Sequence, residues 1–154
     1  MTFTFCILIM GVSGAGKTTV GQLLAEQIGG VFVDGDDLHP SVNILKMKSG
    51  IPLSDADRWP WLDQILEVAR DRAQAQPVII GCSALKESYR QRLASISYHL
   101  VYLKGHPIDI KARLQKRTGH FMPSELLGSQ YTDLEEPEDA LVVPAAWTPD
   151  KIVK

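Results

Sequence analysis

Cysteine, net charge and long hydrophobic runs are all scarce in this sequence. Cys6 and Cys82, the two cysteines, lie in apolar stretches and are expected to be buried thiols rather than a disulfide or a metal site. A formal net charge of −2 with no Lys/Arg cluster provides no surface for nucleic acid. No apolar run approaches the roughly 20 residues that span a membrane, and the N-terminus lacks the features of a secretion signal. These absences predict a cytoplasmic protein with neither nucleic acid nor membrane as a partner.

Apolar runs and helical patterns alternate along the 154 residues. The strand-like runs occupy residues 3–10, 31–33, 77–82, 98–103 and 140–143, and stripes of helical spacing fall within residues 17–28, 61–69, 85–96 and 108–114. Strands that alternate with helices form a parallel sheet that is covered on both faces. A chain of this length supports one hydrophobic core. The sequence therefore predicts an α/β fold in a single domain over residues 1–154.

A phosphate-binding pattern, G-x-x-x-x-G-K-[ST], stands between the first strand and the first helix, which is the context that the pattern requires. Its glycines let backbone N–H groups turn inward, and the helix N-terminus adds partial positive charge. Lys17 is expected to reach the outer phosphates of a nucleotide, and the Thr18 hydroxyl to ligate Mg²⁺. The expected nucleotide-binding residues of this loop are Gly11, Val12, Ser13, Gly14, Ala15, Gly16, Lys17 and Thr18.

Two polar stretches, residues 34–60 and 116–137, interrupt the alternation of strands and helices. Ligands of an open parallel sheet bind at the carboxyl ends of its strands, and both stretches leave from such ends. Long insertions at that edge usually have a function, such as binding a ligand or closing over it. We therefore expect residues 34–60 to bind the substrate and residues 113–137 to form a lid and the segment that follows it.

An acidic run, Asp34-Gly35-Asp36-Asp37, follows the second strand directly. Three carboxylates in four residues repel one another, so the run needs a cation or a hydrogen-bond donor nearby. In an extended segment Asp34 and Asp36 project to the same side. One of the two would hold water ligands of Mg²⁺ and the other would accept the proton of a substrate hydroxyl; a solvated acidic turn is the alternative. His39, beside this run, is the only histidine expected to take part.

Arginines supply the complementary charge. Arg58 follows two aspartates and is expected to bind a carboxylate or phosphate, unless it forms a structural ion pair with Asp55 or Asp57. The helix there begins either at a capping box of Ser54 and Asp57 or at Pro60.

A second pair of arginines, Arg113 and Arg117, lies four residues apart on one helix face. This pair is typical of a lid that closes over a nucleotide. Arg117 would supply charge to the transferring phosphoryl group, and Arg113 would contact the base or a phosphate. A plain solvated helix face is the alternative.

The third apolar strand lacks the aspartate with which a Walker B strand usually ends, because it finishes in Gly81-Cys82-Ser83. The metal must then rely on Thr18, the nucleotide and Asp34.

Several segments together resemble the gluconate kinase family of phosphate-loop kinases. Besides the phosphate loop, these are 34–40, 43, 46–47, 50, 52–53, 57–58, 60–62, 82–86, 89–90, 102–105, 113, 117, 119–121, 129–130 and 134–137. The phosphate loop alone identifies only a superfamily. The segments 34–40, 57–62 and 82–86 are much more specific.

The resemblance implies transfer of a phosphoryl group from ATP to the 6-hydroxyl of D-gluconate with Mg²⁺, in a cytoplasmic homodimer. It also implies a five-stranded parallel sheet like that of shikimate and adenylate kinases. By similarity to shikimate kinases, Asp34 serves the metal, Asp36 binds the substrate hydroxyl and Arg58 holds the substrate carboxylate. The remaining substrate contacts that the resemblance implies are His39, Lys86 and Arg90.

Two other functions stay open on the sequence alone. A nucleotide-dependent switch is disfavoured, because the D-x-x-G and N-K-x-D elements of a GTPase are absent. A kinase of shikimate, of a nucleoside monophosphate or of another sugar acid differs in the shape of its pocket, which sequence does not reveal.

Overall fold

The computed structural model describes residues 5–12, 14–116, 127–138 and 140–145. They contain a five-stranded sheet in the order β2-β3-β1-β4-β5, and every strand pairs in parallel with its neighbours. The strands are β1 (Cys6–Met10), β2 (Val31–Asp34), β3 (Val78–Gly81), β4 (Tyr98–Lys104) and β5 (Leu141–Pro144). Each lies within one or two residues of a strand-like run in the sequence, apart from β1, which begins three residues later. The predicted α/β fold with a parallel sheet is confirmed.

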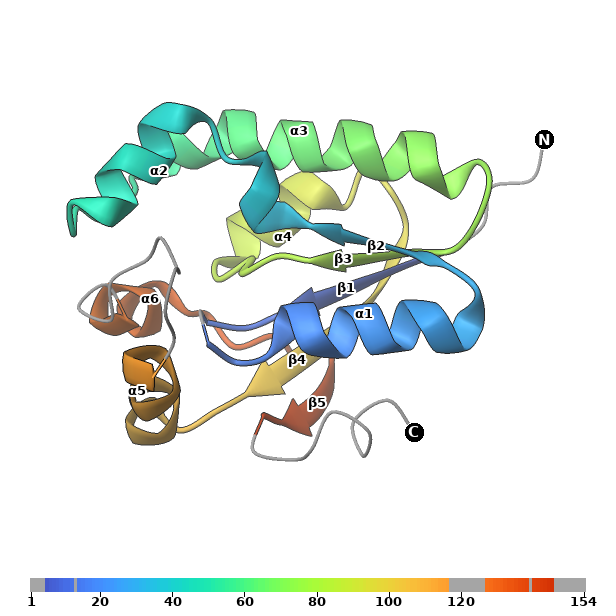
Figure 1. Ribbon diagram of the computed structural model, residues 1–154. Helices are drawn as coiled ribbons and strands as arrows, with labels where there is room; N and C mark the ends of the chain where they lie inside the picture. Colours follow the sequence, from blue (N-terminus) through green and yellow to red (C-terminus); the bar gives the residue numbers. More distant parts are fainter. Residues whose placement is uncertain (1–4, 13, 117–126, 139, 146–154) are drawn as a thin grey trace.

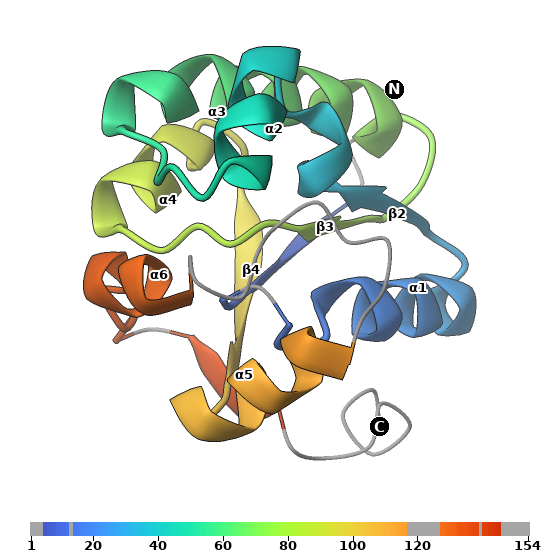
Figure 2. The ribbon, with the colours of Figure 1, turned by 60° about the vertical axis from the view of Figure 1, so that its left-hand side comes forward.

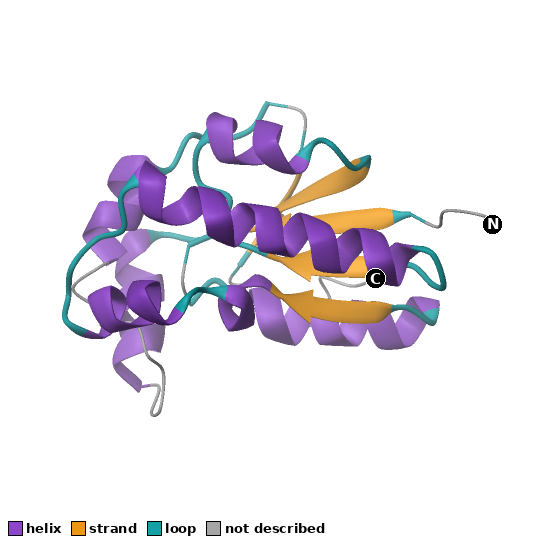
Figure 3. Ribbon diagram, turned by 90° about the horizontal axis from the view of Figure 1, so that it is seen from above, coloured by secondary structure: helices purple, strands orange, loops and turns teal. Residues whose placement is uncertain are grey.

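Helices cover both faces of the sheet, which makes three layers (Figure 1). On one face lie α3 (Asp55–Ala73) and α4 (Glu87–Leu93), and on the other lies α1 (Lys17–Ile28). Residues of β1 alternate between the two layers: Leu8 and Met10 are buried in one hydrophobic cluster and Ile9 in the other. The longest helix, α3, lies along the sheet above its strands (Figure 3). The strands are thus buried on both faces, which explains their near-continuous apolar sequence.

The carboxyl ends of the strands carry most of the remaining helices (Figures 1 and 2). The stretch after β2 contains a 3-10 helix, η1 (Gly35–Leu38), and α2 (Ser41–Lys48). The stretch after β4 contains α5 (Pro107–Lys116) and α6 (Leu127–Asp133). The polar insertions are therefore partly helical, and they lie at the edge of the sheet where ligands of such folds bind.

Helix α3 begins at the capping box and not at Pro60. The Ser54 side chain accepts a hydrogen bond from the Asp57 N–H, and the Asp57 carboxylate accepts one from the Ser54 N–H. Pro60 lies in the second turn, where it removes the N–H that would bond to the Ala56 carbonyl and its ring crowds that carbonyl. This cap sets the position of every later residue of α3, including Arg58.

Both cysteines are buried and free, as expected. Burial raises the pKa of each thiol, to about 12 for Cys82. In the part of the chain that the structure describes, no helix has the length and apolar character needed to cross a bilayer.

Helix α1 approaches β2 closely at Gly21. A Cβ atom added there would lie 2.2 Å from a carbon of the Phe32 ring. This contact presses the helix that follows the phosphate loop against the strand that leads to the acidic run.

Substitution of Gly21 by Ala should lower stability, although Gly→Ala inside a helix normally stabilises by about 0.5–1 kcal/mol. The clash with Phe32 should outweigh that gain, with a net loss on the order of 1–3 kcal/mol, measured by urea unfolding. Gly128→Ala on α6 is the matched control, because its added Cβ meets no atom within 4 Å. Equal effects of the two substitutions would contradict the close approach.

Candidate active site

The phosphate loop joins the end of β1 to the start of α1, in the middle of the sheet. Gly14 and Gly16 have φ angles of 87° and 103°, which L side chains rarely adopt, so the loop needs glycine at these positions. Gly16 is the N-cap of α1, and among the described residues no side chain caps this helix. Amide N–H groups at such a helix end form a ready site for phosphate.

Lys17 folds back onto this loop. Its Nζ atom donates to the carbonyl oxygens of Gly11 and Val12, at 2.8 and 3.0 Å, and the side chain is buried. The ammonium group thus lies beside the loop that is expected to hold the phosphates. Ser13, the remaining loop residue of the pattern, lies outside the described residues.

The acidic run contacts the start of α1 through Asp34. The Thr18 hydroxyl donates to Asp34 Oδ2 at 3.1 Å, while Asp34 Oδ1 accepts the Asp36 N–H at 3.0 Å. The expectation of an extended segment is wrong: Asp34 ends β2 and caps η1, so Asp36 already lies in a 3-10 turn. The turn forms because the Asp34 carboxylate satisfies the free N–H at its start. It leaves Asp36 half-buried and Asp37 exposed.

The Thr18 and Asp34 oxygens suit a magnesium ion, which prefers oxygen ligands and keeps several of its waters. Among the described residues there is no group of three or more His, Cys, Asp and Glu side chains that could hold a metal ion. A magnesium site at this place would therefore depend on the hydroxyl, one carboxylate and oxygens of the nucleotide.

Segments that carry three of the candidate residues approach one another at the end of β3: α1 with Lys17, η1 with Asp36 and α3 with Arg58. A Cβ atom added at Gly81 would lie 3.7 Å from the Cβ of Lys17, and one added at Gly35 would lie 3.5 Å from the Cβ of Cys82. Trp61 of α3 donates to the Gly35 carbonyl at 2.6 Å. The end of β3 is thus the place where the helix of the phosphate loop, the acidic run and the helix of Arg58 meet.

His39 follows η1 and stacks on Trp61 of α3, with ring centroids 4.0 Å apart. Burial, with a smaller contribution from the positive charge of Arg58, lowers the pKa of His39 to about 4. The imidazole is therefore neutral near pH 7 and can only donate or accept hydrogen bonds there. Asn43 lies within 3.3 Å of its Nδ1 atom and also donates to the Asp57 carbonyl.

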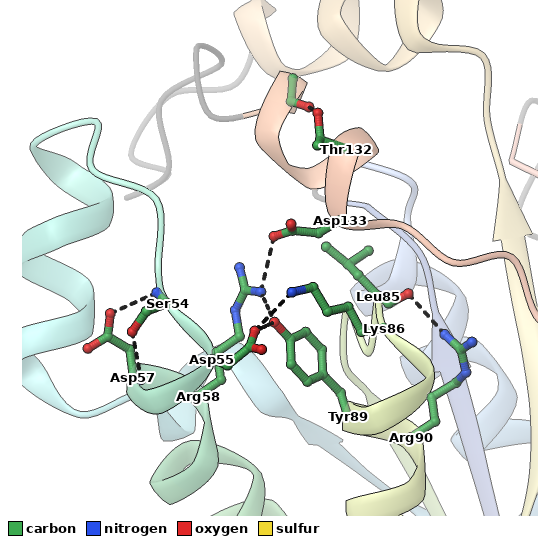
Figure 4. A network of polar contacts seen from close by, with 11 residues as sticks. Ser54, Asp55, Asp57, Arg58, Leu85, Lys86, Tyr89, Arg90, Thr132 and Asp133 are labelled. Carbon is green, nitrogen blue, oxygen red and sulfur yellow. Dashed lines mark hydrogen bonds and ion pairs between the residues drawn. The ribbon is translucent and has the colours of Figure 1, made fainter.

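Arg58 lies on α3 in a network of polar contacts between three helices (Figure 4). Its Nη1 atom donates to the Tyr89 hydroxyl and forms an ion pair with Asp133 Oδ2 at 3.2 Å. The expected alternative, an ion pair with Asp55 or Asp57, is not the contact that forms. Asp55 instead pairs with Lys86 at 3.0 Å, and Asp57 with Lys46 at 2.9 Å.

Arg90 and Arg113 have mostly backbone partners. Arg90 is 3% exposed and donates to the carbonyls of Ala84, Leu85 and Glu135. These bonds favour a structural role for Arg90, and its assignment to the substrate stays a prediction.

Arg113, on α5, donates to the carbonyls of Gly14, Ala15 and Ala145. It supports the back of the phosphate loop, which differs from the solvated helix face considered above. Its proposed partner in a lid, Arg117, lies outside the described residues.

Sequence reasoning did not identify Asp133, Tyr89, Asn43 or Trp61 as parts of this site. Asp133 lies 75 residues after Arg58, and no local spacing relates the two. Tyr89 and Trp61 fall on apolar helical stripes, where an aromatic residue is normally a core residue. Their polar atoms, a hydroxyl and an indole N–H, were the available signal, because such groups find a partner when buried.

Comparisons with known proteins identify the family. A model of the AAA domain family matches residues 6–137. The thermosensitive gluconokinase of Escherichia coli K12 is 46% identical over 134 residues, which cover 85% of this chain and 72% of that protein. The gluconokinase of Gluconobacter oxydans 621H is 45% identical over 136 residues, covering 86% and 76%.

Solved structures give the same result. A gluconokinase from Sinorhizobium meliloti 1021 matches with a TM-score of 0.85 and 45% identity, over 99% of this chain and 89% of that one. A shikimate kinase from Bacteroides thetaiotaomicron matches with a TM-score of 0.62 and 20% identity over 97% and 94%, which shows the shared fold alone. With its phosphate loop, its parallel sheet and these relatives, the chain belongs to the gluconokinase family of phosphate-loop kinases.

Proposed function

We propose that this chain is a gluconokinase, which transfers the γ-phosphoryl group of ATP to the 6-hydroxyl of D-gluconate. The observation that carries the proposal is the approach of three elements at the end of β3, namely α1, η1 and α3, which carry Lys17, Asp36 and Arg58. Phosphoryl transfer to a hydroxy acid needs a cation for the phosphates, a base for the hydroxyl and a cation for the carboxylate. The identity to gluconokinases supports gluconate as the acid.

At the phosphate end, the loop N–H groups and the N-terminus of α1 bind the phosphates. Lys17 leaves the Gly11 and Val12 carbonyls to neutralise charge on the γ-phosphoryl group. Arg113, which bonds to the Gly14 and Ala15 carbonyls in the free protein, contacts the base or a phosphate of ATP. Arg117 supplies further charge from the lid, residues 113–137.

Thr18 and Asp34 would hold Mg²⁺, Asp34 through water. The ion would supply positive charge that neutralises the phosphates.

At the acceptor end, the oxygen of the 6-hydroxyl attacks the γ-phosphorus, and Asp36 accepts the proton of that hydroxyl. The bond between the γ-phosphorus and the bridging oxygen breaks, and ADP leaves with that oxygen. Arg58 holds the carboxylate of gluconate. The further substrate contacts are His39, which like Arg58 belongs to residues 34–60, and Lys86 and Arg90, which lie outside that range. His39, neutral at pH 7, contributes a hydrogen bond rather than a charge.

The resemblance to the family further supports a homodimer that works in the cytoplasm. Sedimentation or light scattering of the purified chain measures the first of these two properties.

A substrate screen tests the proposed activity. ADP formation from ATP and Mg²⁺ should be fastest with gluconate, and slower or absent with shikimate, other aldonates and AMP, because the identity to gluconokinases favours gluconate among the acids. Activity on AMP but not on gluconate would overturn the proposal. A chelator added to the gluconate reaction should stop turnover.

Replacement of Lys17 by Ala should abolish turnover, because both phosphate binding and stabilisation of the transition state need the ammonium group. Lys111→Ala, an exposed lysine of α5, is the control and should keep wild-type kcat. An unchanged kcat in Lys17→Ala would refute the role of the loop.

Replacement of Asp36 by Asn should lower kcat by roughly 10²–10⁴, the usual contribution of a general base. Asp37→Asn offers a matched control one residue away, since Asp37 is exposed. A change confined to KM would show instead that Asp36 only positions the substrate.

A further inference from the structure

We propose that Asp133 is a stand-in for the substrate carboxylate: it neutralises Arg58 in the free enzyme and is displaced when gluconate binds. The proposal rests on the proposed function, in which Arg58 holds that carboxylate. It assigns Asp133 as a residue that sets substrate affinity without touching the reacting atoms.

The first support is that Arg58 needs a counter-ion. Its side chain is 10% exposed, and a guanidinium in such surroundings is costly unless it is paired. Tyr89 contributes a neutral hydroxyl and a ring face, whose centroid lies 5.0 Å from the guanidinium carbon. Neither group carries charge, so the ion pair with Asp133 provides the compensation.

The second support is that the two carboxylates nearest to Arg58 in the sequence, Asp55 and Asp57, are paired with other cations. Asp55 accepts hydrogen bonds from Tyr89 at 2.5 Å and Lys86 at 3.0 Å, and these contacts lower its pKa. Asp57 is held by Lys46 and by the capping box, and its pKa is lowered to about 2. Both stay ionised and paired, which leaves Asp133 as the exchangeable anion of the network.

The third support is the position of Asp133 at the end of its own helix. It is the last residue of α6, where the helix dipole disfavours a carboxylate. Its side chain is 26% exposed, so it can return to water once another anion takes its place. The ion pair with Arg58 therefore holds the Asp133 side chain in place against this dipole (Figure 4).

A third carboxylate cannot enter this network without consequence. Arg58 and Lys86 carry two positive charges, and Asp55 and Asp133 balance them. A gluconate carboxylate that binds Arg58 would face Asp133 at close range, and like charges at such a distance repel. Exchange of one carboxylate for the other keeps the balance, and its cost reduces the affinity for gluconate.

The test is Asp133→Asn, which removes the charge at nearly constant size. KM for gluconate should fall about three- to tenfold, since loss of a competing, partly exposed ion pair is of that order. The change should lie in KM and not in kcat, because Arg58 contacts the acid equally in the ground and transition states. Binding of the uncharged analogue D-glucitol, measured by calorimetry, should not tighten.

Asp63→Asn is the matched control, because it removes a carboxylate from another Asp–Arg pair, with Arg92 at 2.8 Å, between α3 and α4. It should leave KM unchanged. Thermal unfolding gives an independent readout: Asp133→Asn should unfold at a lower temperature than wild type without gluconate, and saturating gluconate should stabilise it by more degrees than wild type. If the Asn variant folds poorly, Asp133→Ser replaces it and is expected to give the same results.

An unchanged or higher KM in Asp133→Asn would overturn the proposal, since a residue that merely positions Arg58 gives that result. Equal tightening of D-glucitol would also overturn it, because the effect would then be steric. In an Arg58→Gln background the substitution of Asp133 should lose its effect on KM. Failure of the proposed function appears separately, as a wild-type chain that forms no 6-phosphogluconate from gluconate.

Discussion

The parallel pairing of β1 with both β3 and β4 is the constraint on which the rest of the structure depends. In this register Ile9 faces Gly81 on one side and Val101 on the other, so the phosphate loop leaves from the middle of the sheet. The pairing of β2 with β3 brings Asp34 to the same level as Gly81. Residues that are far apart in the sequence thus end at one edge, with helices from both layers above them.

Four described cations at this edge are paired in the free protein, but their partners differ. Lys17 and Arg113 bond to carbonyls of the phosphate loop, and Arg90 bonds to carbonyls of the turns around α4. Arg58 is paired with a carboxylate from another helix. The carbonyl partners of Arg90 and Arg113 stay with the fold, whereas the carboxylate of a residue at a helix end can leave. In the proposed function Lys17 and Arg58 both exchange their partners for groups of the substrates, and Arg58 does so by releasing Asp133.

The sheet and the phosphate loop could be predicted because their signals are local. Alternating apolar runs and a fixed eight-residue pattern depend only on near neighbours in sequence. The geometry of Asp36 could not be predicted, because it depends on Asp34. The Asp34 carboxylate caps a 3-10 turn and also contacts Thr18, sixteen residues away. The partner of Arg58 could not be predicted for the same reason. Two aspartates lie close to it in the sequence, but Asp57 belongs to the capping box of α3 and Asp55 pairs with Lys86.

The hydrogen bond from Trp61 Nε1 to the Gly35 carbonyl, at 2.6 Å, joins α3 to η1. Trp61 lies three residues after Arg58 on this helix, and Gly35 directly precedes Asp36, so the backbone positions of Arg58 and Asp36 are both tied to α3. In the proposed function these two residues hold the two ends of the substrate. The separation that α3 sets between them would then match one length of carbon chain.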